Sequence, residues 1–125
     1  MEQIPAGNLE FVVGVRDGRT GDGGPSILVR TTIDGAEVQL LRFDCFRERP
    51  HYHYAPGGAN TSYDIDPTLF SDSLGWVIAQ LGASLGPMVE RAGFPAVAEG
   101  IDREAVATGL AKVEAHFASE ALAAS

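Results

Sequence analysis

The segment Ser26–Phe46 reads SILVRTTIDGAEVQLLRFDCF and places two apolar, β-branched runs on either side of the dipeptide Asp34-Gly35. Asp-Gly best suits a two-residue type I′ turn, because both positions of that turn need positive φ. The sequence therefore predicts an antiparallel hairpin in which Ile33 faces Ala36. The same register continues as Thr31 opposite Val38, Val29 opposite Leu40, and Ile27 opposite Arg42.

The residues before this hairpin predict one more strand and an exposed loop. Residues 9–16 alternate between apolar and other residues with a period of two, which is typical of a strand. Residues 17–25 (DGRTGDGGP) contain four glycines and a proline and predict a loop. A phosphate-cradling glycine loop is followed by a helix N-terminus, whereas a strand is expected here, so a flexible loop is favoured.

The residues after the hairpin predict two further strands and then two helices. Residues 47–50 form a polar turn, and residues 51–54 and 61–65 alternate as short strands around a loop at 55–60. From residue 72 the apolar period changes to three and four, which predicts helices near 72–92 and 102–118.

Strands first and helices last indicate an α+β fold of one domain, residues 1–125. We expect an antiparallel β-meander of four or five strands, followed by two α-helices that pack on one face of the sheet.

Composition restricts the classes of partner. The net charge is −8 and Lys112 is the single lysine, which disfavours nucleic acid even though Arg42, Arg47 and Arg49 lie close together in the sequence. Residues 1–5 lack a basic segment followed by an apolar run, and no stretch is apolar enough to span a membrane. We therefore expect a cytoplasmic protein, with a protein partner or a homo-oligomer as the remaining possibilities.

Residues 40–66 contain the side chains that could carry chemistry. If residues 47–50 and 55–60 are both loops, Asp44 faces His53 and His51 faces Asp64. Strand alternation then divides the side chains between two faces. The polar, solvent-facing set is Arg42, Asp44, His51, His53, Ser62 and Asp64. The other set, expected under the helices, is Phe43, Cys45, Tyr52, Tyr54, Tyr63 and Ile65.

Two histidines at positions i and i+2 of a strand project side by side, so both imidazoles can reach one ion. A carboxylate from a neighbouring strand would complete the set, which gives His51, His53, Asp44 and Asp64 as candidate metal ligands. Such ligands suit a divalent transition metal, namely zinc, iron, manganese or nickel. The alternative is that both histidines only form hydrogen bonds on the sheet face.

The same residues also permit chemistry without a metal. His51 or His53 would act as general acid or base, Arg42 would stabilise an anion, and Asp44 would orient His53. A nucleophilic role for Cys45 is disfavoured, because a thiol on the core face would be buried and inert.

A family resemblance covers about residues 43–117. It rests on Cys45-Phe46, Pro50-His51-Tyr52-His53-Tyr54, Pro56, Asp66-Pro67-Thr68 and Trp76. These motifs resemble those of an uncharacterised bacterial family known only as a domain of unknown function, so the resemblance implies no activity and no catalytic residue. Arg42-Phe43-Asp44 followed by histidines is also similar to small toxins of toxin–antitoxin pairs.

Two functional hypotheses follow from the sequence. The first is a small binding or accessory module whose polar sheet face around His51 and His53 contacts a metal ion, a small anion or a partner protein. The second is a small hydrolase or ribonuclease-type, toxin-like enzyme that uses the same histidines with Arg42 and Asp44. The absence of a convincing nucleophile, phosphate loop or full ligand set favours the module.

Overall fold

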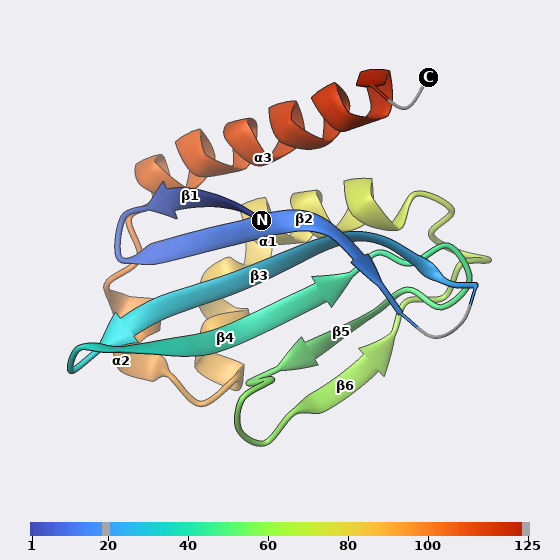
Figure 1. Cartoon of the computed structure of the whole chain (residues 1–125). Coiled ribbons are helices and arrows are strands. Elements are labelled where there is room, and N and C mark those ends of the chain that lie inside the picture. Colours follow the sequence, from blue (N-terminus) through green and yellow to red (C-terminus); the bar gives the residue numbers. More distant parts are fainter. Residues whose placement is uncertain (19–20, 124–125) are drawn as a thin grey trace.

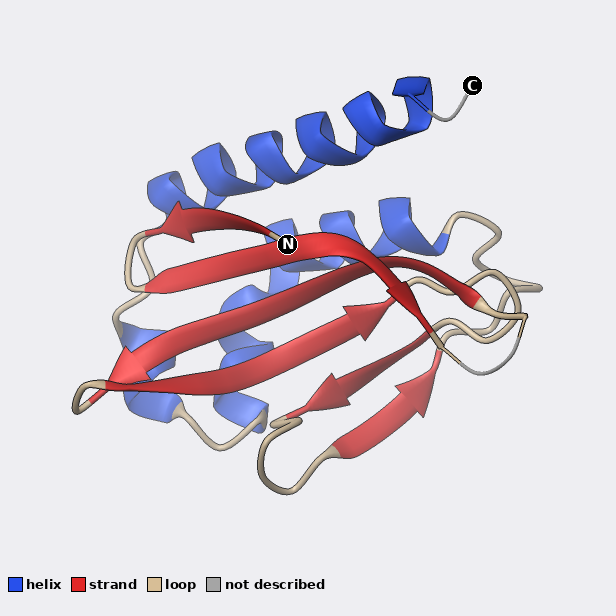
Figure 2. Ribbon diagram, in the orientation of Figure 1, coloured by secondary structure: helices blue, strands red, loops and turns tan. Residues whose placement is uncertain are grey.

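A computed structural model describes residues 1–18 and 21–123. It contains an antiparallel six-stranded sheet whose strands lie side by side in chain order. The strands are β1 (Glu2–Ala6), β2 (Leu9–Asp17), β3 (Gly23–Ile33), β4 (Ala36–Asp44), β5 (His51–Tyr54) and β6 (Thr61–Asp64). The helices are α1 (Ser73–Arg91), α2 (Pro95–Glu99) and α3 (Arg103–Ala123). The predicted α+β order, with a meander followed by helices on one face, is confirmed (Figures 1 and 2).

The sheet has one strand more than the sequence predicted. β1 is short and contains Pro5, which suppressed the strand signal, but proline is tolerated in an edge strand. Ile4 and Ala6 of β1 are buried, and the strand pairs with β2. The predicted loop at 17–25 is also shorter than expected, because β2 includes Asp17 and β3 starts at Gly23; residues 19 and 20 of that loop lie outside the described residues.

The β3–β4 hairpin follows the predicted register only as far as its middle. Asp34 and Gly35 have φ of 51° and 80°, and Thr31 lies opposite Val38 as predicted. A β-bulge then shifts the register, so that Val29 lies opposite Leu41 and Ile27 opposite Phe43. The predicted partners Leu40 and Arg42 are wrong, because the inserted residue displaces every later pair by one position.

The β4–β5 connection is longer than the predicted four-residue turn, and Asp44 lies opposite His51 rather than His53. The reason is that the chain after β4 continues to bond to the start of β3. The backbone N–H of Cys45 donates to the Pro25 carbonyl at 2.8 Å, and that of Arg47 to the Gly23 carbonyl at 3.1 Å. The β5–β6 register, with His51 opposite Asp64, is the predicted one.

The helices begin and end where their capping residues indicate. The Asp72 side chain accepts the Gly75 N–H, and Gly93 follows α1 with φ of 103°. Asp102 accepts the N–H groups of Glu104 and Ala105 at the start of α3. The five-residue helix α2 was not predicted. No helix in the described part of the chain combines the length and apolarity that crossing a membrane requires.

One hydrophobic core lies between the sheet and the helices. Its fully buried members include Phe11, Val29 and Phe43 from the sheet. The helices contribute Val77, Leu81, Leu85 and Val89 from α1, and Val106, Leu110, Val113 and Phe117 from α3. Because strand side chains alternate, burial of Phe43 and Leu41 turns Arg42 and Asp44 to the opposite face of the sheet.

We predict that Gly35→Val destabilises the fold by about 1–3 kcal/mol, because a β-branched residue strongly resists a φ near +80°. Gly57→Val is the matched control: Gly57 lies outside the positive-φ region, and a Cβ added there meets nothing within 4 Å. Chemical unfolding of the two variants measures the difference. Equal stabilities would contradict the role of this turn.

Candidate functional site

The candidate site lies on the sheet face away from the helices, over β3, β4 and β5 (Figure 1). Cross-strand pairing aligns its residues in two adjacent rows. One row is Ser26, Asp44, His51 and Asp64. The next row is Leu28, Arg42, His53 and Ser62. The bulge in the β3–β4 hairpin turns Arg42 and Asp44 to this face, away from the core.

Asp44 is the centre of the site and is only 1% exposed. Its Oδ1 accepts hydrogen bonds from Arg16 Nη1 at 3.1 Å and Ser26 Oγ at 3.0 Å. Its Oδ2 accepts from Arg42 Nε at 3.2 Å. The sequence predicted a solvent-facing carboxylate, but these donors cover it, so Asp44 is a buried anion compensated by two guanidinium groups.

His51 lies between two acceptors. Its Nδ1 is 2.8 Å from the Arg49 carbonyl oxygen, and its Nε2 is 3.2 Å from Asp44 Oδ2. A carbonyl oxygen cannot donate, so Nδ1 carries the proton. The Arg49 carbonyl therefore fixes the orientation of the ring, with Nε2 beside the Asp44 carboxylate.

His53 is arranged differently. Its Nε2 is 3.2 Å from Arg42 Nη2 and 3.7 Å from Asp44 Oδ2. Since a guanidinium only donates, Nε2 accepts this hydrogen bond and the ring is neutral. Burial lowers the pKa of His53 below its ordinary 6.5, and the neighbouring charges of Arg42 and His51 lower it further. The rings of His51 and His53 are adjacent, with centroids 5.0 Å apart.

The structure brings together most, but not all, of the predicted site residues. Asp44, His51 and His53 each present a ligand atom within 4.8 Å of the other two. Asp64 lies outside this group, because its exposed carboxylate pairs with Arg49 at 3.5 Å. Arg42 lies on the same sheet face as the histidines, as predicted, and donates hydrogen bonds to both Asp44 and His53.

Sequence reasoning missed Arg16 and Ser26. The predicted registers covered neither the pairing of β2 with β3 nor the shifted pairing of β3 with β4. Ser26 on β3 lies opposite Asp44, and the Arg16 side chain on β2 extends across β3 to Asp44. Pairing β2 with β3 around the glycine-rich loop would have indicated them, because Gly14 lies opposite Ser26 and Arg16 is the next residue on that face.

Cys45 lies on the helix side of the sheet and is buried. The pKa of its thiol is raised to about 12, mainly by burial; a hydrogen bond with Ser73 opposes the rise, and the carboxylates of Asp44 and Asp72 add to it. The thiol is therefore protonated at neutral pH and takes no part in the cluster on the opposite face.

Comparison with known proteins gives a family without an assigned activity. Residues 3–117 match the family model described as "Domain of unknown function (DUF7700)". The matched range includes every residue of the cluster around Asp44. No curated protein and no solved structure matches the chain significantly.

We predict that Asp44→Asn costs about 2–3 kcal/mol, somewhat less than the loss of one partner in a fully buried ion pair, because both arginines stay partly in water. Asp64→Asn, which removes an exposed carboxylate paired with Arg49, should cost no more than about 0.5 kcal/mol. Urea unfolding of both variants tests this. Similar losses would show that Asp44 is not the structural centre of the cluster.

A second prediction concerns Cys45. A maleimide should label the native protein much more slowly than the urea-unfolded protein, because the buried thiol is almost entirely protonated. Timed mass spectrometry counts the single adduct. Fast labelling of the native protein would restore Cys45 as a candidate nucleophile.

Proposed function

We propose that this chain, which belongs to the family described as Domain of unknown function (DUF7700), is a binding module that holds a small anion at the cluster around Asp44. Phosphate is the simplest ligand of this class. The observation that carries the proposal is the excess of positive charge that the cluster concentrates on an otherwise acidic chain.

Arg16 and Arg42 contribute two positive charges and Asp44 one negative charge, so the cluster is cationic even when both imidazoles are neutral. The whole chain has a net charge of −8, so this concentration of positive charge is local. An anion that binds here offsets charges that Asp44 alone leaves uncompensated.

The cluster also keeps donors that Asp44 does not use. Arg16 donates to Asp44 through Nη1 only, and Arg42 through Nε to Asp44 and Nη2 to His53. The remaining N–H groups of both side chains form no hydrogen bond with described residues. The side chains are 38% and 26% exposed, so these donors can reach a ligand. Guanidinium groups bind phosphate or carboxylate oxygens in a fork-like, often bidentate manner.

A divalent metal is the second candidate. The Nε2 atoms of His51 and His53 lie 3.2 and 3.7 Å from Asp44 Oδ2, near the separation of about 3–3.5 Å that neighbouring ligands have around one zinc ion. The carbonyl oxygen of Arg49 holds Nδ1 of His51, as outer partners of metal-bound histidines do.

Arg42 is the obstacle to this metal site. Its Nε and Nη2 already bond to Asp44 Oδ2 and His53 Nε2, so the guanidinium occupies the place between them that a metal ion would take. A metal would have to displace Arg42 and tolerate the charge of Arg16 nearby. The guanidinium of Arg42 already supplies a positive charge at this place, and its presence favours the anion proposal over a metal.

The hydrolase or ribonuclease-type alternative requires a free imidazole nitrogen. Both nitrogens of His51 face protein acceptors, and Nε2 of His53 accepts from Arg42. Nδ1 of His53 has no hydrogen-bond partner among the described residues, but it is buried, so a substrate does not reach it. General acid–base catalysis through Nε2 of His53 would therefore need the substrate to draw Arg42 away first. This makes anion binding the prior step in an enzyme as well as in a binding module.

Calorimetric titration with inorganic phosphate tests the proposal. Arg16→Gln and Arg42→Gln should each weaken phosphate binding by about ten- to a hundredfold, the usual effect of losing one charge-assisted hydrogen bond. Arg30→Gln is the matched control: Arg30 lies on the same sheet but is already paired with Glu10 and Glu37, so phosphate affinity should stay unchanged.

Titration with zinc, manganese and nickel separates the two candidates, because Arg42→Gln affects them in opposite directions. It should weaken the binding of an anion but strengthen that of a metal by freeing His53 and Asp44. The metal proposal would replace the anion proposal on three results together. The wild-type protein would not bind phosphate but would bind one metal ion. The Arg42→Gln variant would bind that metal more tightly, and the His51→Ala/His53→Ala variant would not bind it.

A further inference from the structure

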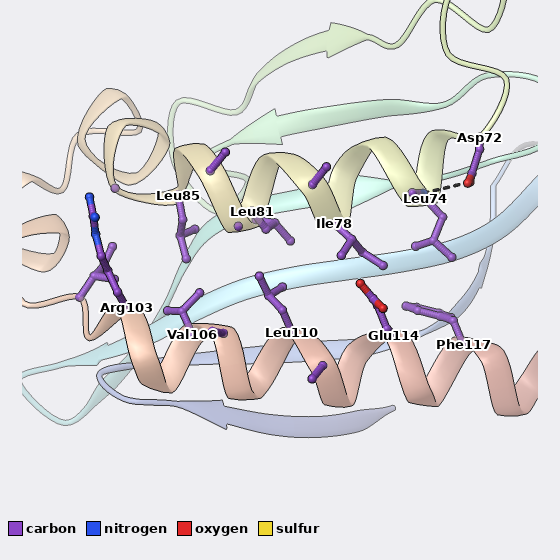
Figure 3. A pocket seen from close by; sticks show the side chains of 18 of the residues that line it. Asp72, Leu74, Ile78, Leu81, Leu85, Arg103, Val106, Leu110, Glu114 and Phe117 are labelled. Carbon is purple, nitrogen blue, oxygen red and sulfur yellow. Dashed lines mark hydrogen bonds between the residues drawn. The ribbon is translucent and has the colours of Figure 1, made fainter.

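A groove runs between α1 and α3 on the helix side of the molecule (Figure 3). Its volume is about 1010 Å³, and its walls are mainly apolar, with Leu81 and Leu85 from α1 and Leu110 and Phe117 from α3. Both helices pack on the sheet, and their facing side chains leave this space open between them. The groove lies on the face opposite to the cluster around Asp44.

Two charged side chains of α3 also line this groove, Arg103 at one end and Glu114 farther along (Figure 3). They are eleven residues apart, close to three full turns, so they share one face of the helix about 16 Å from each other. Neither forms an ion pair with a described residue, and they are too far apart to pair with each other. Each is a charge that the single chain leaves without a partner.

We propose that the groove is the interface with a second copy of this chain. When α3 packs antiparallel against α3 of the copy about a two-fold axis, Arg103 of each chain meets Glu114 of the other, and both charges are paired at once. A symmetric partner is the occupant that this pattern fits, because the same patch provides the cation and its complementary anion.

The sizes of the side chains fit the same arrangement. The exposed side chains between Arg103 and Glu114 on the groove face of α3 are small ones, Ala107 and Ala111. Val106 and Leu110, which also line the groove, are buried at its base. Small exposed residues at these positions let two helices approach closely.

Charge exchange between positions 103 and 114 tests the proposal in the full chain. Sedimentation velocity over a range of concentrations should show a species of twice the 13.2 kDa mass of one chain. Arg103→Glu and Glu114→Arg should each raise the dimer dissociation constant by about tenfold or more, because like charges then face each other twice. The double variant should restore the wild-type constant. Within one chain the two positions are too distant to interact, so restoration can only arise between chains.

Lys112→Glu is the matched control, since residue 112 lies on the opposite side of α3 from Arg103 and is exposed. It should leave the dissociation constant unchanged. A chain that is monomeric at every concentration would overturn the proposal, as would a double variant that associates no better than the single ones. A monomer that retains a long-chain fatty acid on purification, detected by mass spectrometry, would assign the groove to an amphiphile instead. Phosphate titration of the same variants keeps this outcome separate from that of the cluster around Asp44.

Discussion

The β-bulge in the β3–β4 hairpin is the constraint on which both the core and the candidate site depend. The Asp34-Gly35 turn sets a register that, if continued, would place Arg42 opposite the fully buried Ile27. One inserted residue, Leu40, reverses the alternation, so that Phe43 takes that place and Arg42 and Asp44 turn to the other face. Leu40 and Leu41 are both fully buried as a result. The alternative would put an arginine and an aspartate into an apolar core, at a cost far above that of one irregular pair.

Asp44 connects the fold to the chemistry of the sheet face. A carboxylate that is 1% exposed is costly to desolvate, and the donors of Arg16, Ser26 and Arg42 compensate it. These donors come from three different strands, so the cluster holds β2, β3 and β4 in one relative arrangement. The same interactions position the histidines: Nε2 of His51 lies beside Asp44, and Arg42 donates to Nε2 of His53. The proposed anion site and the stability of the sheet therefore depend on the same contacts.

The two proposed surfaces lie on opposite sides of the molecule and differ in chemistry. The sheet face carries concentrated positive charge over a buried carboxylate, whereas the groove between α1 and α3 is mainly apolar, with Arg103, Glu114 and Asp72 as its charged lining residues. A second copy seated on the groove would leave the cluster around Asp44 open on both chains. Association and anion binding can thus occur together, and neither depends on the other.

The sequence by itself determined the class of fold, the hairpin turn, the two long helices and the division of the strand 51–54 between two faces. These follow from local rules: Asp-Gly favours one turn, helical periodicity shows one apolar face, and Tyr52 and Tyr54 must point away from His51 and His53. The sequence also placed Asp44 and Arg42 with the histidines. It could not find the bulge at Leu40 or the pairing of Cys45 and Arg47 with β3, because both are decided by the packing of distant strands. Only the tertiary structure therefore showed that Asp44 is buried, that Arg16 and Ser26 join it, and that Asp64 turns instead to Arg49. Whether a carboxylate is a free ligand or an enclosed counter-ion depends on which strands lie beside it, and that contact has no local signal in the chain.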